Sequence, residues 1–387
     1  MSLSGGGKRA ALFHLGALRR LNELGILHRV DEVSSVSGGS LASAHLATYL
    51  TRNKIVSLQQ PIPDSDWEEG IWRTFQEFVK SDIRTRPFIK RFLPPWNLFK
   101  ASIEVDTLAK ELQQQLTPVM LTDLPEHPDF VLDATDLAFG VNWEFRRRRM
   151  GDYLAGYITP PPKDWPLARA VAASNCFPPI FQPMPIRFRA SEFEGGDAVK
   201  SPDYAQAIAD VRLTDGGNYD NFGLEPIWKN REIVLVSDGG GSFDFEPDKR
   251  LIWRILRYPS ILDNQTRALH RRWLYASFRN HEMRGAYWRI SNARNTYLDD
   301  DSSGYSKELA ERFIAKVRTD LNGFSEAESK ILENHGYLLA DAAVQAFLSD
   351  LVQGAWPELK PPHPEWLPPR VTETAIKKAL FPDYRGN

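Results

Sequence analysis

The sequence lacks the features that mark disulfide-rich, membrane-spanning or nucleic-acid-binding proteins. Cys176 is the single cysteine among 387 residues, so no disulfide can form within the chain, and a reducing compartment is permitted. No run of apolar residues is long enough to cross a bilayer. The formal net charge of −2 provides no general attraction to nucleic acid, so we expect no nucleic-acid partner.

Metal-binding and secretion signals are missing as well. The eight histidines and the cysteine do not cluster at metal-ligand spacing, so we predict no metal site, and nothing indicates a cofactor. An apolar stretch near the N-terminus imitates a signal peptide, but Arg19 and Arg20 follow it without a cleavage site. We therefore expect a cytoplasmic or peripheral membrane location, while export without a cleaved signal peptide stays open.

The pattern of apolar residues predicts an α/β protein. Leucines and alanines at helical spacing indicate a helix over residues 10–24, which Gly25 ends. A strand over 30–36 and a helix over 40–50 follow, an order typical of βαβ units with a parallel sheet. Further strands are predicted at 130–134, 142–145, 211–213 and 233–236.

Composition divides the chain into parts, which we interpret as one domain over residues 1–387 with an insertion. The segment 52–125 is rich in proline, aromatic residues and charge, and is predicted to be a helical insertion or lid. The remaining parts are two core blocks, 1–51 and 126–245, and a mainly helical C-terminal extension, 246–387, with helices expected at 307–321 and 326–351.

A glycine loop precedes the first predicted helix. It reads Ser4-Gly5-Gly6-Gly7-Lys8-Arg9. Three glycines let the backbone turn sharply and leave N–H groups uncovered, and a helix N-terminus adds a positive dipole end. Such a loop can hold a phosphate or a transition-state oxyanion, although it lacks the spacing of a nucleotide-binding P-loop.

A second motif, Ser35-Val36-Ser37-Gly38-Gly39, stands between a predicted strand and a predicted helix. This context is typical of a nucleophile elbow, a strained turn that presents a serine hydroxyl and needs small neighbours. Serine replaces glycine at the first small position. The motif makes Ser37 the candidate nucleophile.

Two aspartates are candidates for the base. Asp215 follows the predicted strand 211–213 and precedes Gly216 and Gly217; Asp238 also follows a strand and precedes glycines. A carboxylate at a strand end can be presented to a neighbouring group, but aspartate is also common in ordinary turns. The residues by themselves leave both candidates open.

In their order, these blocks resemble the patatin-like phospholipase family. A fourth block, 172–183, is similar to the family's alanine-serine stretch with spaced prolines. The resemblance spans roughly residues 4–223. It implies a three-layer α/β/α fold with a mostly parallel central sheet, and a lipid or phospholipid substrate at a membrane or micelle surface.

The resemblance also implies a role for each matching residue. Ser37 would attack the acyl carbonyl, and Asp215 would accept its proton without a histidine. The loop Gly5 to Lys8 would form the oxyanion hole from backbone N–H groups. Arg9 matches an arginine that is linked to the lipid phosphate in the cytosolic phospholipases of this superfamily.

Three functions other than lipid hydrolysis are compatible with these motifs. The same dyad would serve a lipid acyltransferase; the glycine loop would serve a non-catalytic lipid- or nucleotide-binding module. A Ser-His-Asp triad would need a histidine late in the chain, and the candidates are His270, His281, His335 and His363.

Two basic stretches invite a membrane interpretation. Residues 84–100 mix aromatic, proline and basic residues, as membrane-interface segments do, and suggest a lipid-facing lid. The run 146–149 consists of four arginines, which would suit anionic headgroups but is more typical of a solvated turn.

Overall fold

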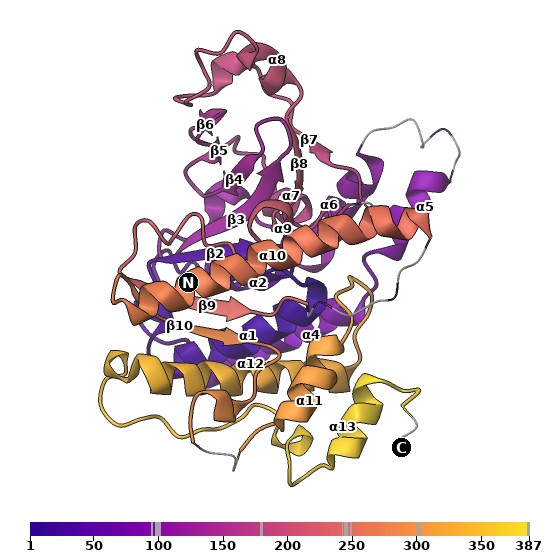
Figure 1. Ribbon diagram of the computed structural model, residues 1–387. Helices are drawn as coiled ribbons and strands as arrows, with labels where there is room; N and C mark the ends of the chain where they lie inside the picture. The colour runs from indigo at the N-terminus through magenta and orange to yellow at the C-terminus, as the bar shows by residue number, and fades with distance from the viewer. Residues whose placement is uncertain are drawn as a thin grey trace.

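The computed structural model describes residues 1–387 except 94–95, 97–101, 179–180, 242, 244–246, 248–249, 300–302 and 385–387. Within this part of the chain, one mixed sheet lies between layers of helices (Figure 1). Its strands, in spatial order, are β10 (Arg284–Arg289), β9 (Ile233–Asp238), β1 (Ser2–Leu3), β2 (Glu32–Val36), β3 (Asp129–Asp136), β4 (Val141–Phe145), β5 (Met150–Asp152) and β6 (Gly156–Ile158), with β8 (Arg212–Asp215) on β3 and β7 (Met184–Pro185) on β8.

The strands β10, β9, β1, β2 and β3 pair in parallel, whereas β4 to β8 pair antiparallel. The predicted α/β/α fold with a parallel central region is thus confirmed, with an antiparallel extension added at one side. The helices are α1 (Gly7–Glu23), α2 (Gly38–Arg52), α3 (Asp64–Asp66), α4 (Arg73–Lys80), α5 (Thr85–Phe92), α6 (Ile103–Gln115), α7 (Leu167–Ser174), α8 (Tyr204–Ala209), α9 (Gly217–Asp220), α10 (Leu251–Arg279), α11 (Lys307–Arg312), α12 (Glu326–Phe347) and α13 (Glu373–Leu380).

The first βαβ unit follows the local sequence closely. β1 is only two residues long and leads through the glycine loop into α1. The helix ends before Gly25, whose φ of 68° is a conformation that glycine adopts without strain. β2 and α2 then follow at the predicted positions.

The C-terminal part of the chain contributes a strand and a helix to the core, and this contribution was not predicted from the sequence. β10 extends the parallel sheet next to β9, and α12 packs along α1 (Figure 1). The two helices approach at glycines, because a Cβ on Gly16 would lie 1.9 Å from the Glu333 carbonyl oxygen. α1 is therefore buried on nearly every side rather than on one face.

Two other predictions need correction. The helix expected over 307–321 ends at Arg312, and a short 3₁₀ turn over Ile314–Lys316 follows. The insertion 52–125 is helical as expected, but its first half packs into the core through Trp67 and Phe75. Part of the predicted lid, residues 94–95 and 97–101, lies outside the described residues.

Candidate active site

The sheet register places the ends of β2 and β8 against each other. β4 occupies one edge of β3, so β2 and β8 share the other edge end to end. Val36 is the last β2 residue and pairs with Asp133, while Asp215 pairs with Ala134, the next residue along β3. The residue after Val36 is Ser37, which therefore meets Asp215 at the point where the strands end.

Ser37 occupies a strained turn between β2 and α2. Its φ is 49° and its ψ is −115°, a conformation that residues with a side chain rarely adopt. Neighbouring groups hold it: the Ser37 N–H donates to Ser174 Oγ at 2.8 Å, and Asn175 Nδ2 donates to the Ser37 carbonyl at 3.0 Å. The Ser37 hydroxyl lies 3.5 Å from Asn175 Oδ1.

Asp215 is 3% exposed, and this burial changes its basicity. Burial raises the pKa of Asp215 to about 7, although hydrogen bonds from the Gly217 N–H and the Ser37 hydroxyl act in the opposite direction. An ordinary aspartate is too weak a base to activate a serine hydroxyl at neutral pH. At about 7, the pKa suits general-base chemistry near neutrality.

The glycine loop lies directly beside the serine. A Cβ on Gly5 would lie 3.3 Å from Ser37 Cβ, and a Cβ on Gly38 would lie 2.2 Å from the Gly7 carbonyl oxygen. Glycine at both positions therefore allows this contact. The Gly5 N–H donates to the Asn221 carbonyl, so it is not available to an oxyanion.

The Lys8 N–H is also engaged, since it donates to the Asp320 carbonyl. In the described part of the chain, Gly6 and Gly7 have no backbone acceptor for their N–H groups. The predicted oxyanion donors Gly5 to Lys8 thus reduce to two candidates. The Lys8 ammonium points away to the Val79 and Ser81 carbonyls.

Arg9 is buried and bound to the protein backbone, contrary to a role in binding substrate phosphate. Its Nη1 donates to the Ala315 and Val317 carbonyls at 2.9 and 2.8 Å, and Nη2 donates to the Gly239 carbonyl at 2.9 Å. The side chain is 2% exposed. Arg9 therefore joins α1 to two distant loops, and its geometry gives no support to phosphate recognition.

We expect Arg9→Ala to lower the free energy of unfolding by about 3 kcal/mol, because three buried carbonyls lose a charged donor. Chemical denaturation measures this loss. At temperatures where the variant is folded, the activity ratio between a phospholipid and a phosphate-free ester should match that of the wild type. Unchanged stability with a selective loss on the phospholipid would restore the phosphate-binding role.

Asp238, the rival base, is bound to other groups. Its Oδ2 accepts from the Tyr287 hydroxyl at 2.6 Å and lies 3.6 Å from Arg289 Nε, while its Oδ1 accepts from the Gly240 N–H. These partners belong to β10 and to the loop after β9, rather than to the elbow. The geometry thus favours Asp215 as the partner of Ser37.

The late histidines lie elsewhere. Three of them bind other groups: His270 binds Asp220, His335 the Ile290 carbonyl, and His363 Glu333. His281 lies just before the amino end of β10, whereas Ser37 lies at the carboxyl end of the parallel strand β2. A triad through any of these residues has no support in this arrangement.

Sequence reasoning missed three residues around the site. Ser174 and Asn175 lie in the recognised 172–183 block, yet no signal assigned them to Ser37. Asn221 fills the space between two glycines, because a Cβ on Gly5 or Gly217 would lie 2.3 or 2.6 Å from its Oδ1. Pro179 and Ile180 of the same block lie outside the described residues.

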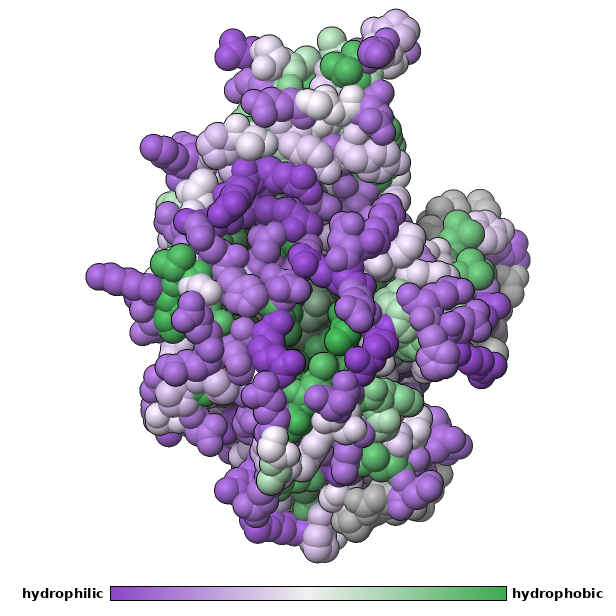
Figure 2. Space-filling model, turned by 90° about the vertical axis from the view of Figure 1, so that its left-hand side faces the viewer, coloured by the Kyte–Doolittle hydropathy of each residue, from purple (hydrophilic) through white to green (hydrophobic). Residues whose placement is uncertain are grey.

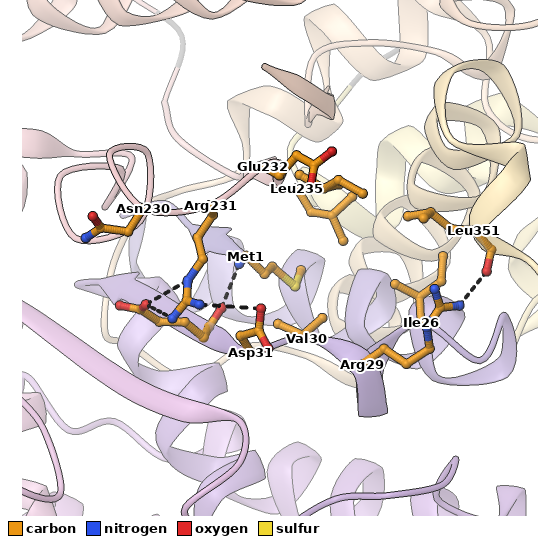
Figure 3. Close-up of a pocket in the computed structure, with 12 residues that line it drawn as sticks. Met1, Ile26, Arg29, Val30, Asp31, Asn230, Arg231, Glu232, Leu235 and Leu351 are labelled. Atoms are coloured by element: carbon orange, nitrogen blue, oxygen red, sulfur yellow. Dashed lines mark hydrogen bonds and ion pairs between the residues drawn. The ribbon is translucent and has the colours of Figure 1, made fainter. Parts of the chain in front are cut away.

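A cavity of about 300 Å³ lies at the opposite end of the strands (Figure 3). Met1, Glu32 and Ile233 line it at the amino ends of β1, β2 and β9, and Arg231 pairs with Glu32 at 2.7 Å. Figure 2, which views this side of the molecule, shows a hollow with apolar side chains inside it. The parallel strands separate this cavity from Ser37, so it is not part of the candidate site.

The residues that the structure describes contain no cluster of three histidine, cysteine, aspartate or glutamate side chains that would hold a metal ion. No helix in the described part of the chain combines the length and the apolar character that a membrane span requires.

Comparison with known proteins assigns the family. A model of the family described as patatin-like phospholipase matches residues 1–228. The chain belongs to this family. The matched part of this patatin-like protein contains the glycine loop, the elbow and Asp215. In a separate comparison with curated proteins, no sequence matches the chain.

A solved structure shows the same fold at low sequence identity. Human GIVD cytosolic phospholipase A2 superposes with a TM-score of 0.50 and 14% identity, covering 91% of the patatin-like chain and 61% of the human one. The same human enzyme in complex with methyl gamma-linolenyl fluorophosphonate and terbium chloride gives a TM-score of 0.48 and 15% identity, covering 91% and 58%. The chain thus spans about three fifths of these proteins.

Proposed function

We propose that this protein is a lipid acyl hydrolase that cleaves fatty acyl esters through a Ser37–Asp215 dyad. The observation that carries the proposal is the meeting of β2 and β8 on one edge of β3, which places a strained serine beside a buried carboxylate. Membership of the patatin-like phospholipase family supports a lipid substrate. A phospholipid or lysophospholipid is the substrate class we propose.

The first half-reaction forms an acyl-enzyme. Ser37 Oγ attacks the ester carbonyl carbon, and its proton passes to Asp215. The carbonyl oxygen gains negative charge, which the N–H groups of Gly6 and Gly7 stabilise. When the intermediate collapses, the C–O bond to the leaving alcohol breaks, and the alcohol takes the proton from Asp215.

The second half-reaction repeats these steps with water. Asp215 removes a proton from water as its oxygen attacks the acyl carbon, and Ser37 leaves with that proton. A fatty acid is released, and the dyad returns to its starting state. Each oxyanion donor is worth roughly 10²- to 10³-fold in kcat in other acyl-transfer enzymes, so the glycine loop would supply much of the acceleration.

The whole chain is proposed to act as one domain over residues 1–387. β10 lies in the same sheet as the elbow, and Arg9 in the glycine loop binds the carbonyls of Ala315 and Val317. A truncated form that ended near the family match would lose these contacts and expose the surface of α1 that α12 covers.

Product analysis tests the proposal. With a phospholipid carrying two different acyl chains, we expect one free fatty acid for each lysophospholipid formed. At early times an added alcohol acceptor should leave that ratio unchanged; acyl transfer to the acceptor would instead assign an acyltransferase. A folded wild-type protein that binds these lipids without releasing or transferring any acyl group would contradict the proposal and favour a binding module.

A further inference from the structure

The first part of α10 packs loosely against the rest of the protein. Among the side chains described from residue 254 to 273, none is buried, and Leu274 is the first that is. Leu274 joins a small core cluster with Phe222 and Tyr287. α10 is thus held in the core by its last turns, while its earlier turns run along the surface.

This exposed part of α10 lies beside the candidate active site. Arg267 Nη1 donates to the Gly241 carbonyl at 2.8 Å, in the loop after β9. His270 pairs at 3.3 Å with Asp220, at the end of α9. α9 begins two residues after Asp215, and Gly239 in the loop after β9 lies against Gly6 of the glycine loop. These two contacts therefore hold α10 against segments next to the candidate site (Figure 1).

The outer surface of the same turns is apolar. Tyr258, Leu262 and Leu269 are 61%, 68% and 59% exposed, and their spacing of four and seven residues places them on one face of the helix. Ile261 lies next to them and is also exposed. Single exposed apolar residues are common, but a stripe of large ones marks an interaction surface.

The charge of α10 indicates what kind of surface it fits. The helix contains one acidic residue, Asp263, against six arginines. The arginines are Arg254, Arg257, Arg267, Arg271, Arg272 and Arg279. A basic helix with an exposed apolar stripe is typical of segments that lie in the interface of anionic membranes.

The basic run 146–149 is paired with carboxylates within the fold. Arg146 bonds to Glu32, Asp129 and Glu144, and Arg147 bonds to Glu126. Each arginine of the run 146–149 therefore has a carboxylate partner, although Arg148 stays largely exposed. α5 lies on the same side of the molecule as the start of α10, and its Phe88 and Ile89 are about half exposed (Figure 1).

We propose that the outer face of α10, defined by Tyr258, Ile261, Leu262 and Leu269, is the surface through which this protein binds an anionic lipid bilayer. The inference rests on the proposed lipid substrate, because it places the dyad next to the bilayer that supplies the ester. The apolar side chains enter the bilayer interface, and Arg272, which is exposed three residues after Leu269, contacts anionic headgroups. Arg267, in contrast, stays bonded to Asp263 and the Gly241 carbonyl.

Vesicle flotation tests this surface without interference from catalysis when every protein also carries Ser37→Ala. The protein with an unchanged α10 should bind phosphatidylcholine vesicles that contain phosphatidylserine, and added salt should weaken this binding. Leu262→Glu with Leu269→Glu should reduce binding at least tenfold. Phe347→Glu, which adds a glutamate at an exposed apolar position at the end of α12 and outside this face of α10, should bind like the wild type.

Activity separates this proposal from the proposed function. With Ser37 intact, the double variant should hydrolyse a soluble short-chain ester as the wild type does, but lose at least tenfold on vesicle lipid. Equal vesicle binding by the double variant and the wild type would overturn the surface while leaving the hydrolase intact. The proposed surface would also be overturned if the wild-type protein does not bind vesicles but forms a dimer that these substitutions dissociate. Binding with the expected pattern but no hydrolysis of any ester would instead overturn the hydrolase.

Discussion

Ser37→Ala should abolish ester hydrolysis, lowering kcat by roughly 10⁴-fold or more, because no acyl-enzyme can form. Ser35, the other serine of the elbow motif, is buried and bonds to Ser43 and the Val131 carbonyl, so it cannot replace Ser37. Steady-state turnover of a soluble chromogenic ester measures the loss. The variant should fold, since alanine removes only the hydroxyl and leaves the N–H that donates to Ser174.

Ser43→Ala is the matched control. Its hydroxyl is buried in the same helix and bonds to Ser35, but it contacts no reacting group, so nearly full activity is expected. A Ser37→Ala protein that retained a substantial fraction of wild-type turnover would show that the ester is cleaved by another mechanism. An inactive Ser43→Ala protein with native stability would show that the assay responds to general disturbance of α2.

Asp215→Asn should be the second most damaging change. Asparagine has nearly the same shape and can still accept from the Gly217 N–H, but it cannot take a proton from Ser37. We expect kcat to fall by about 10³-fold or more. Asp238→Asn should keep most of the activity and lose stability instead, because it weakens the contacts to Tyr287 and Arg289. The reverse pattern would make Asp238 the base.

The raised pKa of Asp215 gives this prediction two further readouts. Since burial raises the pKa to about 7, kcat/KM should fall by about tenfold per pH unit below that value, as the base becomes protonated.

The second readout is stability. The folded state binds the Asp215 proton more tightly than the unfolded chain does, so the stability that protonated Asp215 contributes is lost as pH rises towards 7. Asp215→Asn should therefore melt at a higher temperature than the wild type above pH 7.

The parts of this protein that could be read from its sequence are the local ones. The glycine loop, α1, β2, the elbow and α2 follow one another without interruption, and each is specified by glycines or apolar spacing within its own few residues. The strained φ of Ser37 could be anticipated because a serine between a strand and a helix, flanked by small residues, is typical of that turn.

The choice of base could not be read in the same way. Asp215 and Asp238 both follow strands and precede glycines, and the residues themselves are equivalent. What separates them is that β8 is antiparallel and takes the place of β2 along β3, whereas β9 is parallel and lies on the other side of β1. Pairing between strands so distant in sequence leaves no trace in local periodicity.

The role of Arg9 depended on contacts about 300 residues away along the chain. The carbonyls of Ala315 and Val317 that bind it lie where the sequence predicted a continuous helix, which would not have left them free to accept. Without knowledge of those contacts, an arginine in a glycine loop looked like a ligand-binding residue.

The strand β10 escaped prediction for a similar reason. It follows a long helix and is buried only through its pairing with β9 and its contact with α12.

The most direct test of the central claim is reaction with a fluorophosphonate followed by mass spectrometry of the modified peptide, with and without anionic vesicles. The Ser37–Asp215 assignment predicts one modified serine, Ser37, with labelling lost in Ser37→Ala and strongly slowed in Asp215→Asn. Modification of a different serine, or a folded wild-type protein that stays unlabelled even with vesicles present, would contradict it.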